Sequence, residues 1–121
     1  MLALAALLAC YAVDGDTIRC GAERIRLLGI DAPEMAGHCR KGRHCAPGDP
    51  FASKRALQAE MQGKTLTIRR VGFDRYGRTL AVVYAGGADV SCLQLAGGFA
   101  IYRGEWDNGR LVARDCPGLA R

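Results

Sequence analysis

The 121-residue sequence lacks several features that would assign it to a familiar class. It contains no CxxC pair, and its two histidines, His38 and His44, each directly precede a cysteine, which is poor spacing for a tetrahedral zinc site. It has no internal repeat and no low-complexity segment. With 50% hydrophobic and 24% charged residues, the composition excludes disordered, collagen-like and coiled-coil chains. We therefore expect one compact domain over residues 10–121.

The sequence also lacks an apolar run long enough to cross a membrane. The run MLALAALLA at residues 1–9 would extend about 14 Å as a helix, against about 30 Å for the bilayer core. We predict no stable membrane span. This segment is either the remnant of a secretory signal or a buried first strand, and the sequence LLAC ending at Cys10 also resembles a lipoprotein cleavage site. Each signal interpretation favours export.

Cysteine, in contrast, is abundant. The six cysteines are Cys10, Cys20, Cys39, Cys45, Cys92 and Cys116. An even number in so short a chain favours disulfides and an oxidising compartment, either the periplasm or the exterior. Cys10 and Cys20 lie five residues either side of Gly15 and would face each other across a hairpin centred there, a pairing that excludes the lipoprotein interpretation. We expect Cys39 and Cys45 to close a polar loop.

The order of short apolar segments and turn residues predicts an α+β fold with a small, strongly bent antiparallel sheet. Asp49 and Pro50 open a helix that ends at Gly63, and a Gly- and Pro-rich loop precedes them. The expected elements are strands at 11–13, 17–20, 23–30, 65–71, 79–85 and 98–102, helices at 50–62 and 90–97, and a loop at 35–50.

Four carboxylates occupy two short segments. Asp14 and Asp16 lie in the first turn, and Asp31 and Glu34 follow the third expected strand. Carboxylates at the ends of neighbouring strands can converge, and clustered oxygens without cysteine or histidine favour a hard cation such as Ca²⁺ or Mg²⁺. Each segment taken alone is equally typical of an ordinary turn.

Nearby arginines narrow the range of functions that these carboxylates indicate. Arg26 lies on the expected strand that leads into Asp31 and Glu34, and Arg75 and Arg78 flank Tyr76 in a hairpin turn. Guanidinium groups bind phosphate oxygens bidentately and stay charged. A cation, a carboxylate base and two arginines together indicate attack of water on a phosphodiester, because negative charge develops on the phosphoryl oxygens.

Four longer strings complete the pattern, in order along the chain. They are VDGDT (13–17), RIRLLGIDAPE (24–34), FDRYGRTLA (73–81) and GGFAIY (97–102). Through them the chain resembles the staphylococcal nuclease, or thermonuclease, family. The resemblance implies a mainly β, five-stranded Greek-key OB-fold barrel with two helices packed against it.

The resemblance also implies a calcium site. Asp16 and Asp31 correspond to the carboxylates that bind calcium, and the backbone carbonyl of Ala32 to a third ligand, although the family often has threonine there. Asp14 corresponds to an acid behind the metal ligands. Glu34 corresponds to the general base.

The same resemblance assigns the substrate contacts. Arg26 and Arg78 correspond to the arginines that hold the phosphate and stabilise the transition state. Arg75, which stands in place of a lysine, Tyr76 and Tyr102 correspond to nucleotide-contacting positions.

The implied reaction is calcium-dependent cleavage of single-stranded or unpaired DNA and of RNA, giving 3′-phosphate ends. The mild net charge of +5 would attract a polyanion in a salt-dependent way. We expect an exported monomer. Two alternatives remain open at this point: an OB module that binds nucleic acid or a protein partner without catalysis, and a disulfide-stapled structural domain with a vestigial site.

Two segments depart from the family pattern. The 35–50 loop is longer and carries two cysteines, and the tail after Tyr102 has no good match to the family's last helix. We expect a Cys92–Cys116 disulfide to pin this tail to the core, with Trp106 packed beneath it.

Overall fold

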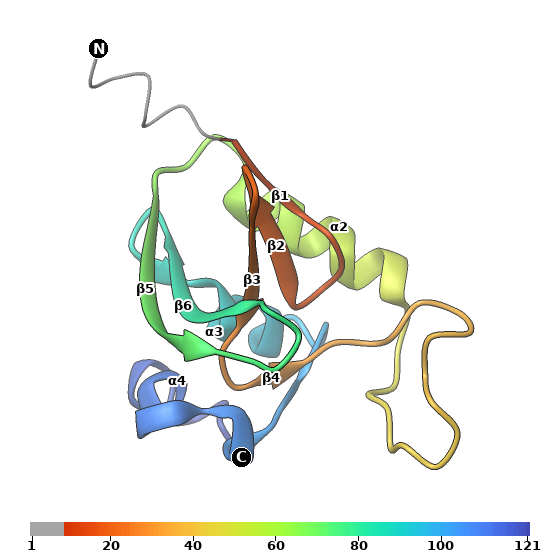
Figure 1. Cartoon of the computed structure of the whole chain (residues 1–121). Helices are drawn as coiled ribbons and strands as arrows, with labels where there is room; N and C mark the ends of the chain where they lie inside the picture. Colours follow the sequence, from red (N-terminus) through yellow and green to blue (C-terminus); the bar gives the residue numbers. More distant parts are fainter. Residues whose placement is uncertain (1–8) are drawn as a thin grey trace.

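The computed structural model describes residues 9–121 and shows a bent sheet flanked by helices (Figure 1). Residues 1–8, which make up most of the segment predicted as a signal remnant or first strand, lie outside the described residues. The elements are β1 (Cys10–Ala12), β2 (Thr17–Cys20), β3 (Glu23–Leu27), β4 (Ile30–Asp31), α2 (Pro50–Met61), β5 (Leu66–Phe73), β6 (Thr79–Ala85), β7 (Ala88–Asp89), α3 (Val90–Ala96), β8 (Ile101–Tyr102) and α4 (Leu111–Asp115), with single 3₁₀ turns at Gly104–Trp106 and Asn108–Arg110.

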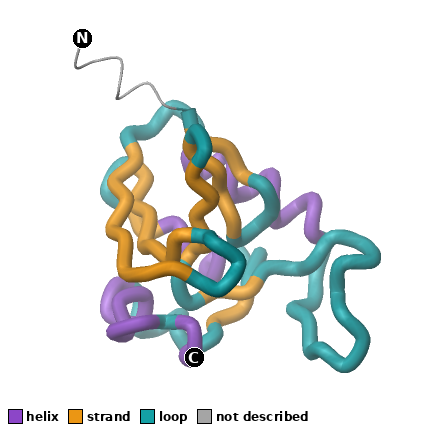
Figure 2. Tube along the Cα trace, viewed as in Figure 1, coloured by secondary structure: helices purple, strands orange, loops and turns teal. Residues whose placement is uncertain are grey.

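The main sheet has the strand order β1-β2-β3-β6-β5, and the short β7 pairs with β6. Figure 2 shows these strands curving around one side of the molecule, with helices on the other side and below. The prediction of a wholly antiparallel sheet was wrong at one place, because β3 and β6 run parallel. The long loop, α2 and β5 together supply the crossover that parallel neighbours require.

The first hairpin has the predicted register. Cys10 pairs with Cys20 across β1 and β2, and the two form a disulfide. The lipoprotein interpretation of Cys10 is therefore wrong for this structure, because its thiol is already bonded. The Cys39–Cys45 and Cys92–Cys116 disulfides are also confirmed.

The main sheet does not close into the barrel that the resemblance implied. Within residues 9–121, no ladder joins the edge strands β1 and β5. The strand expected over 23–30 breaks after Leu27, since Gly29 adopts φ +75°, a left-handed conformation that interrupts a strand. The chain resumes as β4, which pairs with β8 in a separate two-stranded ladder. The outcome is an open sheet.

Helices α2 and α3 pack against the sheet, as expected. Asp49 caps α2 by accepting hydrogen bonds from the amides of the second and third helical residues. Gln94 on α3 joins the two helices and the first turn, because its side-chain amide donates to the carbonyls of Gly15 (2.8 Å) and Ser53 (3.0 Å). Fully buried apolar side chains fill the space between helices and sheet, among them Ile18, Ile25, Leu57, Val83 and Val90.

The tail contains a third helix that the sequence did not predict. Helix α4 buries Leu111 and Val112 against Leu28 and Val82, and the Cys92–Cys116 disulfide ties it to α3. Asp107 holds its start, accepting hydrogen bonds from the amides of residues 112 and 113, both at 3.0 Å. Across the described part of the chain, no helix is long and apolar enough to cross a membrane.

Glu23 joins three strands and provides a test of the sheet. Its carboxylate accepts hydrogen bonds from Arg70 on β5 (2.7 and 2.9 Å) and from the Thr79 hydroxyl on β6 (2.7 Å). These bonds, chiefly those from Arg70, lower the pKa of Glu23 to about 2, from an ordinary 4.5. The resulting stabilisation is fully present above pH 4.5 and is lost as the pH falls toward 2.

We expect Glu23→Gln to lower the free energy of unfolding by about 1 kcal/mol at pH 7, because the pair is partly exposed and solvent weakens it. Urea unfolding followed by circular dichroism should show a much smaller difference near pH 2. Glu105→Gln, at an exposed position, is the control. An equal loss at both pH values would contradict the assignment.

Candidate functional site

A cleft of about 780 Å³ opens where several turns meet. Its walls come from the first hairpin turn, the end of β3, the 74–78 turn, the 35–49 loop and the tail near residue 106. The predicted site residues that line it are Asp14, Asp16, Arg26, Glu34, Arg75, Tyr76 and Arg78. The structure thus brings both arginines and the expected base to one cavity.

Asp16 is a buried carboxylate that contacts the backbone of Ala32, another of the expected metal ligands. Its Oδ2 accepts a hydrogen bond from the Ala32 amide (2.7 Å) and lies 3.5 Å from Nη1 of Arg26. Asp14 accepts a hydrogen bond from the Asp16 amide at 3.1 Å. Burial, reinforced by the negative charge of Asp16 and opposed by Arg26, raises the pKa of Asp14 to about 7.

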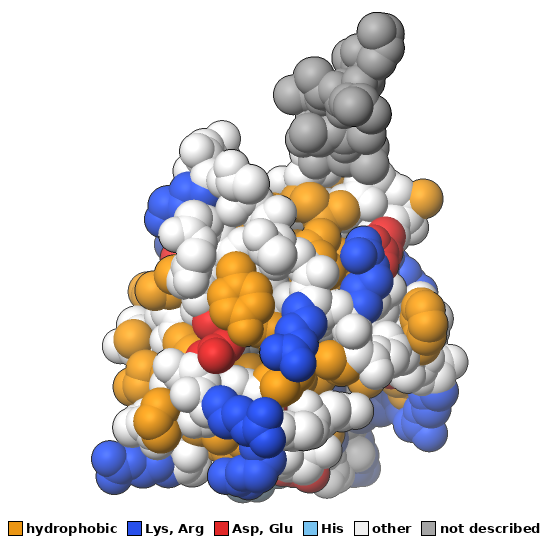
Figure 3. Space-filling model, turned by 90° about the vertical axis from the view of Figure 1, so that its left-hand side faces the viewer, with side chains coloured by type: hydrophobic (Ala, Val, Ile, Leu, Met, Phe, Trp, Pro, Cys, Tyr) orange, Lys and Arg blue, Asp and Glu red, His pale blue; other side chains and the backbone are white. Residues whose placement is uncertain are grey.

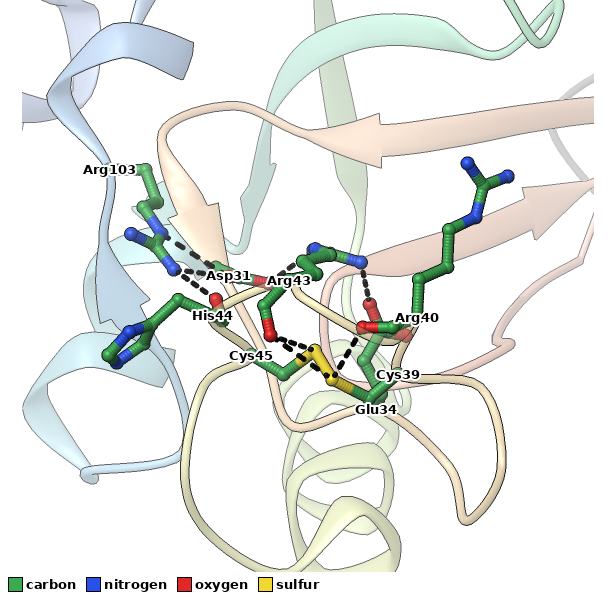
Figure 4. The surroundings of a disulfide bond; sticks show 8 residues. All are labelled: Asp31, Glu34, Cys39, Arg40, Arg43, His44, Cys45 and Arg103. Atoms are coloured by element: carbon green, nitrogen blue, oxygen red, sulfur yellow. Dashed lines mark hydrogen bonds and ion pairs between the residues drawn. A yellow bond between two sulfur atoms is a disulfide. The ribbon is translucent and has the colours of Figure 1, made fainter.

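Asp31 is almost wholly buried, with 1% of its surface exposed, and two arginines neutralise it. Arg103 Nη2 lies 3.1 Å from Oδ2, and Arg43 Nη2 lies 3.6 Å from Oδ1. Arg43 also binds Glu34, with Nη1 2.5 Å from Oε1. Figure 4 shows Arg43 placed between the two carboxylates while Arg40 points away from them.

The Cys39–Cys45 disulfide shapes the loop that carries Arg43. This loop contains no helix or strand, as predicted, and the disulfide joins its two sides. Arg103 donates a hydrogen bond to the carbonyl of His44 at 2.9 Å, which fastens the loop to the tail. No sequence motif marks Arg43 or Arg103, and the polar loop closed by two cysteines was the only signal near Arg43.

The 74–78 turn presents cations around an aromatic ring. The guanidinium carbons of Arg75 and Arg78 lie 5.2 and 5.6 Å from the centre of the Tyr76 ring. Arg78 is held by Asp74, with Nε 2.7 Å from Oδ2. Arg24, which the sequence analysis did not select, donates to the Tyr76 carbonyl at 2.6 Å. Hydrogen bonding from Arg75 lowers the pKa of Tyr76.

Two aromatic residues of the C-terminal part lie differently from expectation. Trp106 is not packed beneath the tail. It is 36% exposed, it lines the cleft, and the guanidinium carbons of Arg26 and Arg103 lie 5.1 and 5.6 Å from its ring centre. The tail buries aliphatic side chains instead. Tyr102 does not line the cleft, and its hydroxyl donates to Asp107 at 2.6 Å, so its nucleotide contact stays a prediction.

The oxygen donors suit a hard cation, although arginines compete for them. The expected ligands, Asp16, Asp31 and the Ala32 carbonyl, offer only oxygen atoms, which Ca²⁺ prefers. Within residues 9–121, no three His, Cys, Asp or Glu side chains gather as a metal site. Both carboxylates already face guanidinium groups. A cation would therefore have to replace Arg43 or Arg103 as the partner of Asp31.

Comparison with known proteins agrees with this arrangement. The family model described as "Staphylococcal nuclease homologue" matches residues 24–113. The chain belongs to the staphylococcal nuclease family. It is also similar to the succinoglycan biosynthesis protein ExoI of Rhizobium meliloti (strain 1021), with 36% identity over 105 residues, which cover 84% of this chain and 53% of ExoI. The chain spans about half the length of that relative.

Membership of the staphylococcal nuclease family gives the chain a nuclease-type domain. The matched region contains most of β3, the 35–49 loop, helices α2 and α3 and most of the tail, so it includes most walls of the cleft. The three disulfides are typical of proteins in an oxidising, non-cytoplasmic environment.

Gly15 allows the acidic turn to approach α2, and its replacement tests that contact. A Cβ atom at this position would lie 1.8 Å from Ser53 Oγ and 2.8 Å from the Ala32 Cβ. We expect Gly15→Ala to lower the free energy of unfolding by about 1–3 kcal/mol through overpacking, measured by urea unfolding. Gly118→Ala, which adds a methyl group in open space, should change little. Equal stability of the two variants would contradict this packing.

Proposed function

We propose that this protein is a calcium-dependent nuclease that hydrolyses phosphodiester bonds of DNA and RNA. The observation that carries the proposal is the single cleft in which Arg26, Arg78 and Glu34 meet the carboxylate of Asp16. A phosphodiester entering it would have guanidinium groups for its oxygens and a carboxylate for the attacking water. The family match supports the same reaction.

Asp16, Asp31 and the Ala32 carbonyl would hold the calcium ion. Their oxygen donors and the burial of Asp31 support this assignment, because a buried carboxylate requires a cationic partner. When bound, the ion supplies positive charge to the phosphoryl oxygens and favours ionisation of water. Asp14, which hydrogen-bonds the Asp16 amide, orients the turn that carries this ligand.

The arginines and Glu34 carry the rest of the chemistry. Glu34 accepts a proton from water as the new oxygen–phosphorus bond forms. Arg26 and Arg78 bind the phosphoryl oxygens and stabilise the charge that develops there. The bond from phosphorus to the 5′ oxygen breaks, that oxygen takes up a proton from solvent water, and the products end in a 3′-phosphate and a 5′-hydroxyl. Arg43 pairs with Oε1 of Glu34, so the attacking water must approach the other carboxylate oxygen or displace Arg43.

We propose single-stranded or unpaired nucleic acid as the preferred substrate. Tyr76 is 48% exposed and Trp106 36% exposed at the cleft, and unpaired bases can stack on such rings. Arg75 lies beside Tyr76 and would contact the same nucleotide. We further propose that residues 10–121 act as one monomeric domain in the periplasm or outside the cell.

One observation favours a second candidate. Arg43 forms ion pairs with both Asp31 and Glu34. This arrangement suits a nucleic-acid-binding or partner-binding module that has lost catalysis. The two candidates differ in whether Glu34 acts as a base when calcium is present: it does in the nuclease and does not in the binding module. They are separated by the following experiment.

We expect Glu34→Gln to reduce cleavage of denatured DNA by about 100-fold or more, because general base catalysis contributes roughly this much. Cleavage should be measured on gels with calcium, with a chelator, and with each variant. Glu105→Gln is a matched control at another carboxylate that lines the cleft. Wild-type protein that binds DNA without any calcium-dependent cleavage would exclude the nuclease and favour the binding module.

We expect Arg43→Gln to bind calcium about fivefold more tightly, because it removes a competing cation worth about 1 kcal/mol. Trp106, the only tryptophan, lies beside Arg26 and Arg103 and provides a fluorescence signal for the titration without activity. Lys41→Gln removes an exposed charge from the same loop and should leave the affinity unchanged. Calcium affinity equal to that of the wild type in Arg43→Gln would show that Arg43 does not compete.

A further inference from the structure

A second hollow, of about 390 Å³, adjoins the cleft. The two cavities share Asp14, Arg24 and Arg78, so a chain that leaves the cleft past these residues would enter the second hollow. Its other lining residues are Tyr11, Ala12, Val13, Thr17, Arg19 and Lys54. The resemblance assigned no role to Tyr11, Arg19 or Lys54, and neither does the reaction described above.

A cross-strand row forms the floor of this hollow. Tyr11 on β1 pairs with Arg19 on β2, and Arg19 pairs with Arg24 on β3. Directly opposed side chains point to the same face of a sheet, so the three side chains lie in one line. Ile18 and Ile25, which come next to Arg19 and Arg24 along their strands, are buried on the opposite face. The row therefore runs from an exposed aromatic ring to the cleft.

Within the described residues, the cations of the row have no carboxylate partner, although Arg19 and Arg24 each donate a hydrogen bond to a backbone carbonyl, at Gly21 (3.2 Å) and Tyr76 (2.6 Å). Arg19 and Arg24 stand directly opposite each other, a like-charge arrangement that destabilises a sheet. Among residues 9–121, neither of them nor Lys54 forms a salt bridge. Asp14 is the only acid in the lining. An anionic ligand would relieve this repulsion.

The aromatic end of the row indicates what kind of anion fits. Tyr11 is 52% exposed, and the adjacent Val13 is 41% exposed. An aromatic ring beside cationic side chains matches a single-stranded polynucleotide, whose phosphates repeat beside bases with free faces. A duplex keeps its bases stacked inside and would leave the tyrosine unused.

We propose that the second hollow is a subsite for the nucleotides flanking the scissile bond of a single-stranded substrate. Arg19 and Lys54 bind the flanking phosphates, and the Tyr11 ring stacks on an unpaired base. This inference rests on the proposed nuclease function, since the hollow is useful only as a continuation of that cleft. It predicts that affinity rises with substrate length.

Binding of oligothymidylates of two and eight nucleotides to the cleavage-deficient Glu34→Gln protein tests the proposal, with calcium present. We expect the longer oligomer to bind more tightly. Adding Tyr11→Ala should weaken its binding about fivefold or more, as expected for loss of one stacked base, and leave the dinucleotide unaffected. Arg19→Gln should lower the slope of log affinity against log salt by about 0.7 for the longer oligomer.

Matched controls come from β5, whose residues line neither cavity. Arg69→Gln removes an equivalent charge, and Phe73→Ala removes an aromatic ring that is 75% exposed. Figure 3 shows that Lys and Arg side chains on the β5 side of the molecule are spread among apolar and neutral ones. Neither control should change the dependence of affinity on length.

Each outcome decides the proposal. Equal effects of Arg19→Gln and Arg69→Gln would overturn it in favour of non-specific attraction. Equal weakening of both oligomers by Tyr11→Ala would overturn it in favour of a disturbed cleft. If wild-type protein cleaves DNA but affinity does not rise with length, the subsite alone fails. If wild-type protein neither binds nor cleaves, the proposed function fails with it.

Discussion

The buried carboxylate of Asp31 is the constraint on which the arrangement of the cleft depends. An ionised carboxylate with 1% exposure is costly unless cations and hydrogen bonds surround it. Arg43 from the disulfide-closed loop and Arg103 from the tail meet this requirement. The Cys39–Cys45 disulfide thus acts beyond its own loop, because it restricts the segment that neutralises the centre of the site.

Close packing places the other side of the site. The Asp14-Gly15-Asp16 turn lies against α2, and Gln94 from α3 binds the carbonyl at its centre. The carboxylates therefore stand on a turn fixed by two helices. Turns from distant parts of the chain meet at one cavity, which Arg78 of the 74–78 turn lines together with Asp16 and Arg26.

Positive charge is distributed unevenly around the cleft. Some arginines have carboxylate partners, as Arg78 has in Asp74, whereas those of the β1–β3 row have none within the described residues. The modest net charge of +5 understates the local field, since several uncompensated cations face the same surface. The proposed hydrolysis and the proposed binding of flanking nucleotides would both depend on this local positive field.

The sequence by itself determined what depends on near neighbours. The symmetric placement of Cys10 and Cys20 around Gly15 set the hairpin register, and Asp49 before Pro50 set the start of α2. The register and the cap follow from strand alternation, turn chemistry and capping, which act over a few residues. The motifs also identified seven residues of the cleft, but only tertiary packing brings their separate segments together.

Only the tertiary structure decided which distant groups complete the site. Arg103 reaches Asp31 across 72 positions of sequence, and Arg43 reaches it from a loop without a motif. The open sheet, the parallel β3–β6 pair and the exposed position of Trp106 likewise depend on how separate segments pack. These contacts depend on the burial of the Asp31 charge and on how the segments pack together, and the spacing of residues along the sequence shows neither.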